Sequence, residues 1–397
     1  MIPNNEIFDA VVVGGGPAGA TAAHELACAG HSVVLLDKAG RIKPCGGAIP
    51  PRLIQDFEIP PELLCARIQS ARMISPSQRT VDMPIDGGYV GMVNREIFDE
   101  YLRQRASAQG AMRCTGTYER MSRDDGQPGA TVHFRSHGEP RSIRARLVVG
   151  ADGALSKVAR QEVSEKPPAY VFAYHEVIEA PSAARSPEFD GARCDVIYDG
   201  ATSPDFYGWV FPHGRTVSVG SGSARSGFKL RASVAQLREQ SGLGAATTIR
   251  HEGAPIPMKP LRRWDNGRDV VLAGDAAGVV APASGEGIYY AMVGGQLAAH
   301  AGAEFLGSED PRALALARKR FMKAHGRVFW ILGIMQSFWY KNDKRRERFV
   351  SMCRDPDVQM LTWQAYMNKK LVRGRPGAHM RIFFKDMAHL LGLASPA

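Results

Sequence analysis

The sequence predicts an α/β protein in which a parallel sheet with covering helices is interrupted by a second, mainly antiparallel sheet. Three observations lead to this fold class. A glycine-rich turn joins an apolar run to a run of small residues near the N-terminus, apolar and polar residues alternate from about 167 to 261, and helical sequence dominates after Gly287. At 397 residues the chain exceeds the usual size of one hydrophobic core, so two or three domains are expected.

The first part of this fold is a strand, a tight turn and a helix. Residues 8–13 form an apolar, valine-rich run typical of a parallel strand covered on both faces, and residues 20–29 predict a helix of small residues. In the turn between them, Gly14 allows the sharp reversal, Gly16 lets the backbone approach a phosphate, and Gly19 lets the helix pack closely on the strand. The free N–H groups at the start of such a helix bind a pyrophosphate.

A second strand is predicted over residues 32–36 and ends at Asp37, about twenty residues after the turn, where a carboxylate can bind ribose hydroxyls. Strand, turn, helix, second strand and terminal acid together predict a dinucleotide site, without distinguishing NAD from FAD. Beyond it, residues 41–51 are too rich in Gly and Pro to be regular. A helix is expected over 94–108, with Asn94 as its N-cap.

The remaining elements follow from hydrophobic periodicity. Strands are expected at residues 131–134 and 145–149, and the second of these runs into Gly150-Ala151-Asp152-Gly153. A further buried strand over 268–273 runs into Gly274-Asp275, and helices are expected from Gly287 to Leu393. The alternating region predicts antiparallel strands at 171–177, 194–198, 207–211 and 216–220.

Composition excludes several classes of protein. The chain is 44% hydrophobic and 23% charged, which is typical of a globular protein, and its six cysteines include no CxxC pair that would suggest a zinc ribbon. The histidines show no metal-ligand spacing.

The longest apolar candidate, residues 328–340, is too short to span a bilayer, so a cytoplasmic protein is expected. No nucleic-acid module is recognisable, and the net charge of +10 indicates either an anionic membrane surface, a phosphorylated substrate or a basic solvated surface without a role.

Three further segments favour FAD as the dinucleotide. Asp275 follows a buried strand among small residues, where it can bind a polyol such as ribityl, although a helix N-cap is the simpler alternative. The segment Pro282-Ala283-Ser284-Gly285-Glu286-Gly287-Ile288 opens a helix whose free N–H groups suit the electron-rich edge of a reduced flavin. Asp152 offers a second acid that faces the nucleotide. Because only one GxGxxG turn is present, NADPH is expected to dock transiently as the reductant.

The ordered set of the glycine turn, Asp152-Gly153 and Gly274-Asp275 resembles the para-hydroxybenzoate-hydroxylase-type flavoproteins over about the first 320 residues. The resemblance implies a discontinuous Rossmann-like FAD-binding domain, an inserted mixed or antiparallel-sheet substrate domain and a helical C-terminal region. It also implies that Arg95 reaches the FAD phosphates and ribose. The family usually has Glu where this chain has Asp37, which keeps the role with a shorter arm.

The inserted sheet contains Pro204-Asp205-Phe206-Tyr207-Gly208-Trp209-Val210-Phe211-Pro212, in which three aromatic side chains project to one face of a strand. Such a row suits a long apolar substrate and a carbocation, but it is equally typical of an aromatic core. Together with Lys43-Pro44-Cys45-Gly46-Gly47, this motif resembles the geranylgeranyl reductase family, and most closely its (bacterio)chlorophyll-synthesis branch.

This second resemblance implies the reduction of three of the four double bonds of a geranylgeranyl group, either free as the diphosphate or esterified to the pigment. An isolated alkene does not accept hydride, so a proton should arrive first or together with hydride from the flavin. The family places the Cys45 loop near the flavin, and a thiol is largely protonated at neutral pH. Cys45 is therefore the first hypothesis for the proton donor, with Tyr207 or a bound water as alternatives.

Two other functions remain open at this point. A flavin monooxygenase shares every FAD motif, and a pigment-binding flavoprotein without catalytic activity would share them as well. The C-terminal segment 327–346 combines aromatic and basic residues, which is typical either of internal packing or of a helix that contacts a membrane surface.

The predicted domains are an FAD-binding domain of residues 1–75, 92–165 and 265–318, a substrate domain of residues 76–91 and 166–264, and a helical region of residues 319–397. No metal site is predicted. The predicted catalytic residues are Cys45, Tyr207, Trp209 and Phe211. The predicted cofactor-binding residues are Gly14, Gly16, Pro17, Ala18, Gly19, Asp37, Lys38, Cys45, Gly46, Gly47, Ala48, Arg95, Asp152, Gly153, Gly274, Asp275, Pro282, Gly285, Gly287 and Ile288.

Overall fold

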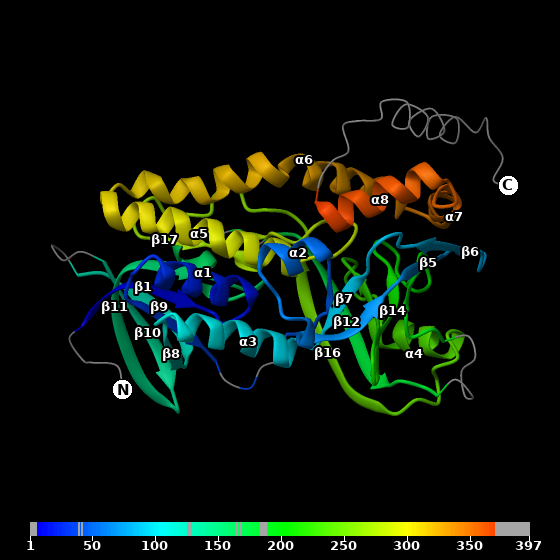
Figure 1. Ribbon diagram of the computed structural model, residues 1–397, viewed down its shortest axis with the longest axis horizontal. Coiled ribbons are helices and arrows are strands. Elements are labelled where there is room, and N and C mark those ends of the chain that lie inside the picture. Colours follow the sequence, from blue (N-terminus) through cyan, green and yellow to red (C-terminus); the bar gives the residue numbers. More distant parts are fainter. Residues whose placement is uncertain are drawn as a thin grey trace. The chain divides into compact units, whose positions relative to one another are not determined.

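The structure is a computed structural model that describes residues 6–38, 40, 43–124, 129–163, 166, 168–182 and 189–369. The chain forms two compact units (Figure 1). Unit 1 comprises Met1–Lys43, Arg95–Tyr170 and Pro255–Leu332, and unit 2 comprises Pro44–Asn94, Val171–Ala254 and Gly333–Ala397. Each unit contains its own sheet.

The sheet of unit 1 has the strand order β8-β2-β1-β11-β10-β9, with β17 paired to β11. Strands β1, β2, β8, β11 and β17 run parallel, whereas β9 and β10 extend the sheet in antiparallel pairs. The bounds are β1 (Ile7–Val13), β2 (Val33–Asp37), β8 (Met112–Thr115), β9 (Thr117–Ser122), β10 (Ala130–Ser136), β11 (Glu139–Gly150) and β17 (Val270–Leu272).

Helices cover this sheet, and two of them pack unusually closely. The covering helices are α1 (Pro17–Cys28), α3 (Arg95–Ala108) and α5 (Ile288–Ser308). The first part of α6 (Leu316–Trp339) packs on α5, where Phe321 and Phe329 contact Tyr290. α1 lies along α5 (Figure 1). A Cβ atom at Gly295 of α5 would overlap the carbonyl oxygen of Ala18 in α1, so the small residues of both helices are what permits this approach. The prediction of a small-residue helix behind the glycine turn is confirmed.

Unit 2 contains a mixed sheet with the order β16-β12-β15-β14-β13-β5-β6 and a smaller sheet with the order β3-β7-β4. Most neighbours in the large sheet are antiparallel, but β13 and β5 are parallel. The large sheet comprises β5 (Ser70–Ile74), β6 (Thr80–Pro84), β12 (Tyr170–Glu179), β13 (Arg193–Ile197), β14 (Gly208–His213), β15 (Thr216–Ser223) and β16 (Thr248–Pro257); the small one comprises β3 (Ala48–Ile49), β4 (Leu64–Ile68) and β7 (Val90–Val93).

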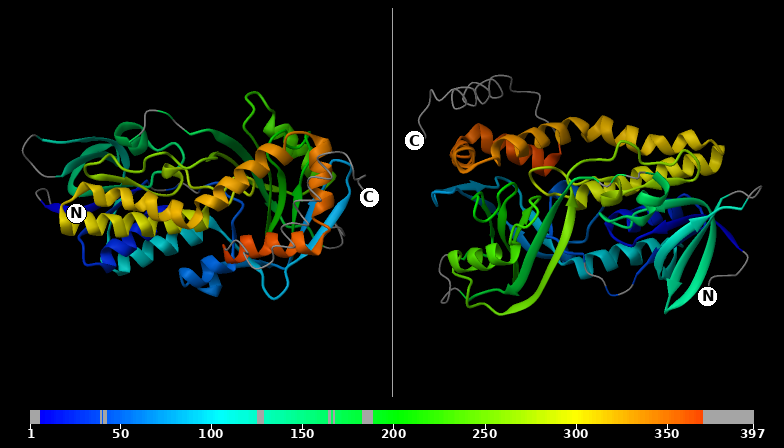
Figure 2. Two further views of the ribbon diagram at one scale, coloured as in Figure 1. Left: turned by 90° about the horizontal axis from the view of Figure 1, so that it is seen from above. Right: turned by 180° about the vertical axis from the view of Figure 1, so that it is seen from behind.

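The two faces of the large sheet have different cores. On one face, α4 (Leu230–Gln240) packs against β15 (Figure 2). Its Val234 and Leu237 join Val210 and Val219 in one apolar cluster. A second cluster brings Phe211 together with the small sheet and with α8 (Pro356–Asn368). Neighbouring residues of β14 thus face opposite cores, as a strand requires. The shorter elements are α2 (Pro51–Asp56), α7 (Asp343–Met352), 3₁₀ turns at Pro61–Leu63, Gly274–Ala277 and Pro311–Ala315, and a π-helical turn at Ala159–Val163.

The bounds of the two units differ from the predicted domains, and residues 255–264, expected in the substrate domain, belong to unit 1. Residues 44–75 were expected in the FAD-binding domain but belong to unit 2, because β4 pairs with β7 and β5 pairs with β13. The C-terminal region, which was expected to be separate, is divided between the two units. The boundary crosses α6 after Leu332, whereas α7 and α8 belong to unit 2. The helices expected between residues 370 and 393 lie outside the described residues, as do Arg41 and Ile42 of the predicted loop.

Within the described part of the chain, no helix has both the length and the apolar character needed to cross a membrane. The predicted elements of both sheets are confirmed, including the strand over residues 268–273, which is shorter than expected at Val270–Leu272. The predicted helix over 94–108 is found as α3, which begins directly after Asn94.

Candidate functional site: a dinucleotide cradle and an aromatic row

The dinucleotide site lies where the carboxyl ends of four parallel strands of unit 1 meet. Val13 of β1 pairs with Leu36 of β2 and with Gly150 of β11, and Gly150 pairs in turn with Leu272 of β17. Residues that directly follow these strands are therefore brought to one edge of the sheet, which is where open α/β sheets bind nucleotides. The predicted residues that the structure gathers there are Gly14, Asp37, Asp152 and Gly274.

The three glycines of the turn differ in what a side chain at each position would meet. Gly14 has φ +105°, and a Cβ atom there would overlap the carbonyl oxygen of Ala151; a Cβ atom at Gly19 would overlap the carbonyl oxygen of Gly14. At Gly16, by contrast, a Cβ atom would meet nothing within 4 Å. Gly14 and Gly19 are thus required by the packing of the protein, whereas the space at Gly16 is open to a ligand.

The start of α1 beside this space suits an anion. Gly16 is the N-cap residue of α1, no side chain caps the helix, and Pro17 occupies its first turn. Uncapped N–H groups and the helix dipole bind phosphate at such a position. The open space at Gly16 and the uncapped helix therefore fit the pyrophosphate of a dinucleotide.

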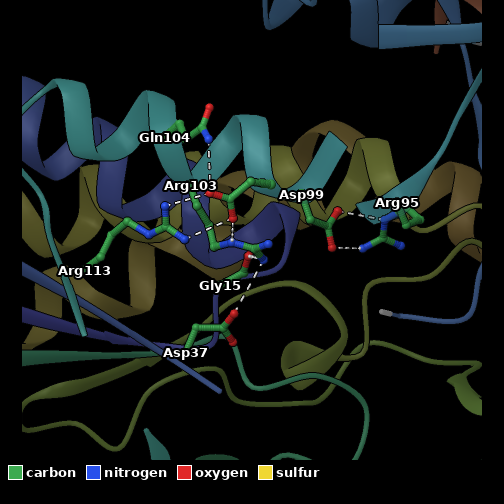
Figure 3. A network of polar contacts seen from close by, with 8 residues as sticks. Gly15, Asp37, Arg95, Asp99, Arg103, Gln104 and Arg113 are labelled. Atoms are coloured by element: carbon green, nitrogen blue, oxygen red, sulfur yellow. Dashed lines mark hydrogen bonds and ion pairs between the residues drawn. The ribbon is translucent and has the colours of Figure 1, made fainter. Parts of the chain in front are cut away.

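Asp37, at the end of β2, lies at one end of a network of charged residues (Figure 3). Arg103 of α3 donates a hydrogen bond to the carbonyl oxygen of Gly15 at 3.0 Å, and its guanidinium lies 3.5 Å from the Asp37 carboxylate. Glu100 binds both Arg103, at 2.9 Å, and Arg113, at 2.8 Å. The hydrogen bond from Arg113 helps to lower the pKa of Glu100 to about 2, so Glu100 remains ionised and holds Arg103 in place.

A second arginine of α3, which was not predicted from the sequence, contacts the glycine turn. Arg95 was expected to reach the FAD phosphates and ribose, and its buried guanidinium forms two hydrogen bonds to Asp99, at 2.8 and 2.7 Å. Arg103, two helical turns later, is the residue that contacts the glycine turn. The sequence contained a signal for Arg103, because residues eight positions apart, such as Arg95 and Arg103, lie near the same face of a helix. A contact between Arg95 and FAD stays a prediction.

The two acids at the ends of β11 and β17 have partners within the protein. Asp152 accepts hydrogen bonds from the Ser156 hydroxyl at 2.5 Å and the Lys157 backbone N–H at 2.7 Å, so it caps the following turn. Asp275 is buried and forms an ion pair of 2.6 Å with Lys43, which sequence reasoning had treated only as part of a motif. Lys43 thereby fixes the direction of the Asp275 side chain. The direct contacts of both acids with FAD stay predictions.

The segment predicted to face the flavin edge is a tight turn that leads into a long helix. The carbonyl oxygen of Ala281 accepts the Gly285 N–H at 3.0 Å, and both Ala283 and Gly285 have positive φ angles. Helix α5 then begins at Ile288, with Gly287 as an N-cap that has no side-chain hydrogen bond. A second uncapped helix N-terminus therefore lies on unit 1, which fits the anionic edge of a reduced flavin.

In unit 2, the predicted aromatic row is confirmed. The ring centroids of Tyr207 and Trp209 are 6.0 Å apart, and those of Trp209 and Phe211 are 6.3 Å apart. The row occupies the face of β14 opposite Val210, which belongs to the α4 core. Tyr207 and Trp209 are only 9% and 6% exposed, while Phe211 is half-buried. Phe211 is thus the ring of the row with the most open surface.

Three aromatic residues that sequence reasoning missed extend the row at its Tyr207 end. The Tyr198 ring lies 6.2 Å from Tyr207, 5.3 Å from Tyr340 and 5.0 Å from Phe349. Buried Arg346 joins these segments, because it donates to the carbonyl oxygens of Pro204 and Tyr340. Part of the aromatic C-terminal segment therefore serves internal packing in unit 2, one of the two alternatives that the sequence left open.

Trp209 is held by a chain of hydrogen bonds that sequence reasoning also missed. Its indole Nε1–H can only donate, and it donates to the Ser218 hydroxyl at 3.1 Å. The Ser218 hydroxyl lies 2.9 Å from His175 Nδ1, and His175 Nε2 lies 3.2 Å from the Glu252 carboxylate. Burial raises the pKa of Glu252, but hydrogen bonds from His175 and Arg250 bring it below its usual value, so Glu252 accepts. The chain runs from Trp209 through Ser218 and His175 to Glu252.

The loop that contains Cys45 lies beside the other end of the row. The backbone N–H of Gly47 points at Cys45 Sγ with a distance of 3.3 Å. A Cβ atom at Gly46 would lie 3.1 Å from the Phe211 ring, so glycine permits close contact between loop and row. Within unit 2 the structure thus brings together the Cys45 loop and the aromatic strand, two predicted features that are more than 150 residues apart.

The fold and the cradle at the strand ends define an FAD-dependent oxidoreductase with one nucleotide-binding turn. Residues 66–314 match the family described as FAD binding domain, and residues 12–57 match the NAD(P)-binding Rossmann-like domain. A geranylgeranyl bacteriochlorophyll reductase-like protein from Thermoplasma acidophilum shares the fold, with a TM-score of 0.80 and 22% identity over 94% of this chain and 99% of that one.

Two relatives define the family more closely. The geranylgeranyl diphosphate reductase of Rhodobacter capsulatus is 57% identical over 98% of this chain and 99% of its own length. That of Synechocystis is 36% identical over 97% and 98%, respectively. The chain belongs to the geranylgeranyl diphosphate reductase family, so the resemblance and the fold class predicted from the sequence are confirmed.

We predict that Gly16→Ala lowers FAD affinity about tenfold or more, because its methyl group would fill the space available to the pyrophosphate. The apoprotein should lose no more than about 1 kcal/mol of unfolding free energy, the usual effect of a poorer N-cap. Flavin absorbance after gel filtration measures the first effect and thermal unfolding the second. Gly191→Ala is the control, since its Cβ atom also meets nothing within 4 Å. Unchanged flavin retention in Gly16→Ala would show that no ligand approaches Gly16.

We predict that Ser218→Ala destabilises the protein by about 1–3 kcal/mol, because it leaves the buried Trp209 N–H without its acceptor. In a Trp209→Phe background the N–H is absent, so the same change should cost about 1 kcal/mol less. Urea unfolding of the four proteins of this cycle gives the coupling energy. Additive effects of the two substitutions would contradict the hydrogen-bonded chain.

Proposed function

We propose that this protein is a geranylgeranyl reductase that uses FAD and NADPH to reduce three C=C bonds of a geranylgeranyl group stepwise to phytyl. The observation that supports this most directly is its 57% identity, over nearly the full length of both chains, to the geranylgeranyl diphosphate reductase of Rhodobacter capsulatus. The substrate is geranylgeranyl diphosphate or a geranylgeranylated (bacterio)chlorophyll. The aromatic row of β14 supports an apolar, alkene-bearing substrate of this kind.

The chemistry sets two demands on the residues of this chain. An isolated alkene must gain a proton before or together with hydride, and positive charge then develops on its more substituted carbon. We infer that the Cys45 thiol delivers this proton and that the π faces of Tyr207, Trp209 and Phe211 stabilise the charge. Reduced FAD, when bound, would supply the hydride and NADPH would replace those electrons, so each cycle would add one proton and one hydride across one double bond.

The choice of Cys45 over Tyr207 as the proton donor is supported by their surroundings in unit 2. The Tyr207 ring is stacked on Phe206, with centroids 4.2 Å apart, and is buried. Cys45 is half-buried in a loop that is joined to Phe211 through Gly46. We therefore assign the proton to Cys45 Sγ and a π-stabilising role to Tyr207.

We propose that NADPH binds only transiently. The match to the NAD(P)-binding Rossmann-like domain covers residues 12–57, and these contain the same glycine turn that we assign to FAD. The sequence contains no second turn of this type. Two nucleotides cannot share one cradle, so NADPH is proposed to reduce FAD from outside it and leave.

We predict that the protein, incubated anaerobically with each substrate and an excess of NADPH, yields products whose masses rise in steps of two hydrogens up to six. Cys45→Ala should slow each step about 10²-fold, the usual contribution of a general acid, while it retains FAD. Mass spectrometry of timed samples measures both effects. In a parallel aerobic incubation, oxygen uptake with a hydroxylated product would instead indicate a monooxygenase, and FAD retention with no change of mass in either incubation would indicate a pigment-binding flavoprotein.

We further propose that α6 contacts an anionic membrane surface. Trp330 is 67% exposed on this helix, and exposed Lys323 and Arg327 precede it. Their spacing of four and three residues places all three on one face of the helix. An exposed tryptophan beside basic residues suits adsorption to anionic lipid, where a prenylated substrate would also be found.

We predict that the protein floats with anionic vesicles and that Trp330→Ala reduces the bound fraction severalfold. Leu155→Ala is the matched control, because Leu155 is also an exposed apolar side chain, at 58%, but lies in a loop without this pattern. High salt should weaken the binding, since the basic residues contribute through screened charge. Equal binding by both variants would exclude α6 as the contact.

A further inference from the structure

The aromatic row of β14 does not end at Phe211. His213 is the next residue on the same face of the strand, and it is buried. Its Nε2 atom lies 3.0 Å from the carbonyl oxygen of Gly46, and its Nδ1 atom lies 3.6 Å from Cys65 Sγ. A Cβ atom at Gly47 would overlap the imidazole ring. His213 is therefore enclosed by the Cys45 loop on one side and by β4 on the other.

The hydrogen-bond partners fix the tautomer of His213. A carbonyl oxygen can only accept, so the proton lies on Nε2 and is donated to Gly46. Burial lowers the pKa of His213 to about 4, which keeps the ring neutral at physiological pH and leaves Nδ1 as an acceptor. Burial also raises the pKa of Cys65 to about 11, so the group that faces Nδ1 is a protonated thiol.

One peptide group connects His213 to Cys45. The C=O of Gly46 and the N–H of Gly47 belong to the same planar unit and point in opposite directions. The C=O accepts from His213, while the N–H is directed at Cys45 Sγ at 3.3 Å. Two features hold Gly47 itself in place. Its φ is left-handed, at +71°, and its carbonyl oxygen accepts a hydrogen bond from the Val93 N–H at 2.9 Å. A rotation of this peptide would break both contacts at once.

We propose that His213 is a positioning residue for Cys45. Its Nε2–H fixes the Gly46–Gly47 peptide, and this peptide directs its own N–H at the Cys45 sulfur. When Cys45 releases its proton, the N–H stabilises the negative charge on sulfur, because hydrogen bonds to a charged group are stronger than those to a neutral one. The assignment of a reaction to Cys45 rests on the proposed function, but the geometry of the loop does not.

The test compares His213→Gln with His213→Leu in the FAD-loaded protein. The amide nitrogen of Gln can occupy the position of Nε2 and donate to Gly46, whereas Leu removes the donor. The readout is the rate of Cys45 alkylation by iodoacetamide at pH 8, determined by peptide mass spectrometry, with the exposed Cys28 as an internal reference. We expect alkylation of Cys45 to be about tenfold slower in His213→Leu and close to the wild-type rate in His213→Gln. Alkylation of Cys28 should not change.

Three results would overturn the assignment: a Cys45 rate in His213→Leu within twofold of the wild type, a faster rate, or a failure of His213→Gln to restore it. Thermal unfolding and flavin content show whether each variant folds. If His213→Leu does not fold, His213→Asn replaces it, because its amide is one methylene too short to reach Gly46. Single-turnover alkene reduction is measured in parallel. A slower alkylation with unchanged reduction would exclude Cys45 as the proton donor and leave the positioning role of His213 standing.

Discussion

Gly150 is the point at which three distant segments of unit 1 are joined. Its carbonyl oxygen accepts the Ala273 N–H at 2.9 Å, and the next residue, Ala151, donates to Val13 at 2.8 Å. A Cβ atom at Gly150 would lie only 2.7 Å from Val158 and 2.8 Å from Leu272. Any larger residue would move β17 or the turn after β11. The edge where the glycine turn, Asp37 and Asp275 meet therefore depends on this close packing, and so does the space at Gly16 that suits a pyrophosphate.

The sequence predicted the elements of this edge well because each is encoded locally. Valine-rich runs identify buried strands, the φ of +105° at Gly14 favours glycine, and a Cβ atom at Gly19 would overlap the carbonyl oxygen of Gly14 within the same turn. Side-chain partners were predicted poorly, because they depend on tertiary contacts. Arg103 reaches Gly15 across 88 positions of the chain and Lys43 reaches Asp275 across 232, and no local pattern specifies either pair. The domain bounds were displaced for the same reason, since β5 pairs in parallel with β13, more than a hundred residues away.

For the aromatic motif, too, the sequence pattern predicted the local arrangement but not the residues that it contacts in the folded protein. Alternation on a strand was enough to place Tyr207, Trp209 and Phe211 on one face. It could not reveal Tyr198, Tyr340 and Phe349, which come from another strand end and from the C-terminal segment. Nor could it reveal the hydrogen bonds of Ser218 to Trp209 and His175, because a serine on a neighbouring strand is unremarkable until the register of β14 and β15 is known.

The polar groups on this face of unit 2 are arranged so that they do not compete with the aromatic rings. The Trp209 N–H is directed at Ser218, and the chain of hydrogen bonds that follows ends at the Glu252 carboxylate, remote from the row in sequence and bound to Arg250 at 3.0 Å. The His213 N–H is bound to Gly46, and its ring is neutral. A carbocation would be captured by a free carboxylate or a neutral imidazole nitrogen that faced it, whereas π faces attract it without forming a bond. With the Trp209 and His213 donors directed toward the protein, their rings present carbon surfaces, which is what the proposed proton-first reduction of an isolated alkene would require.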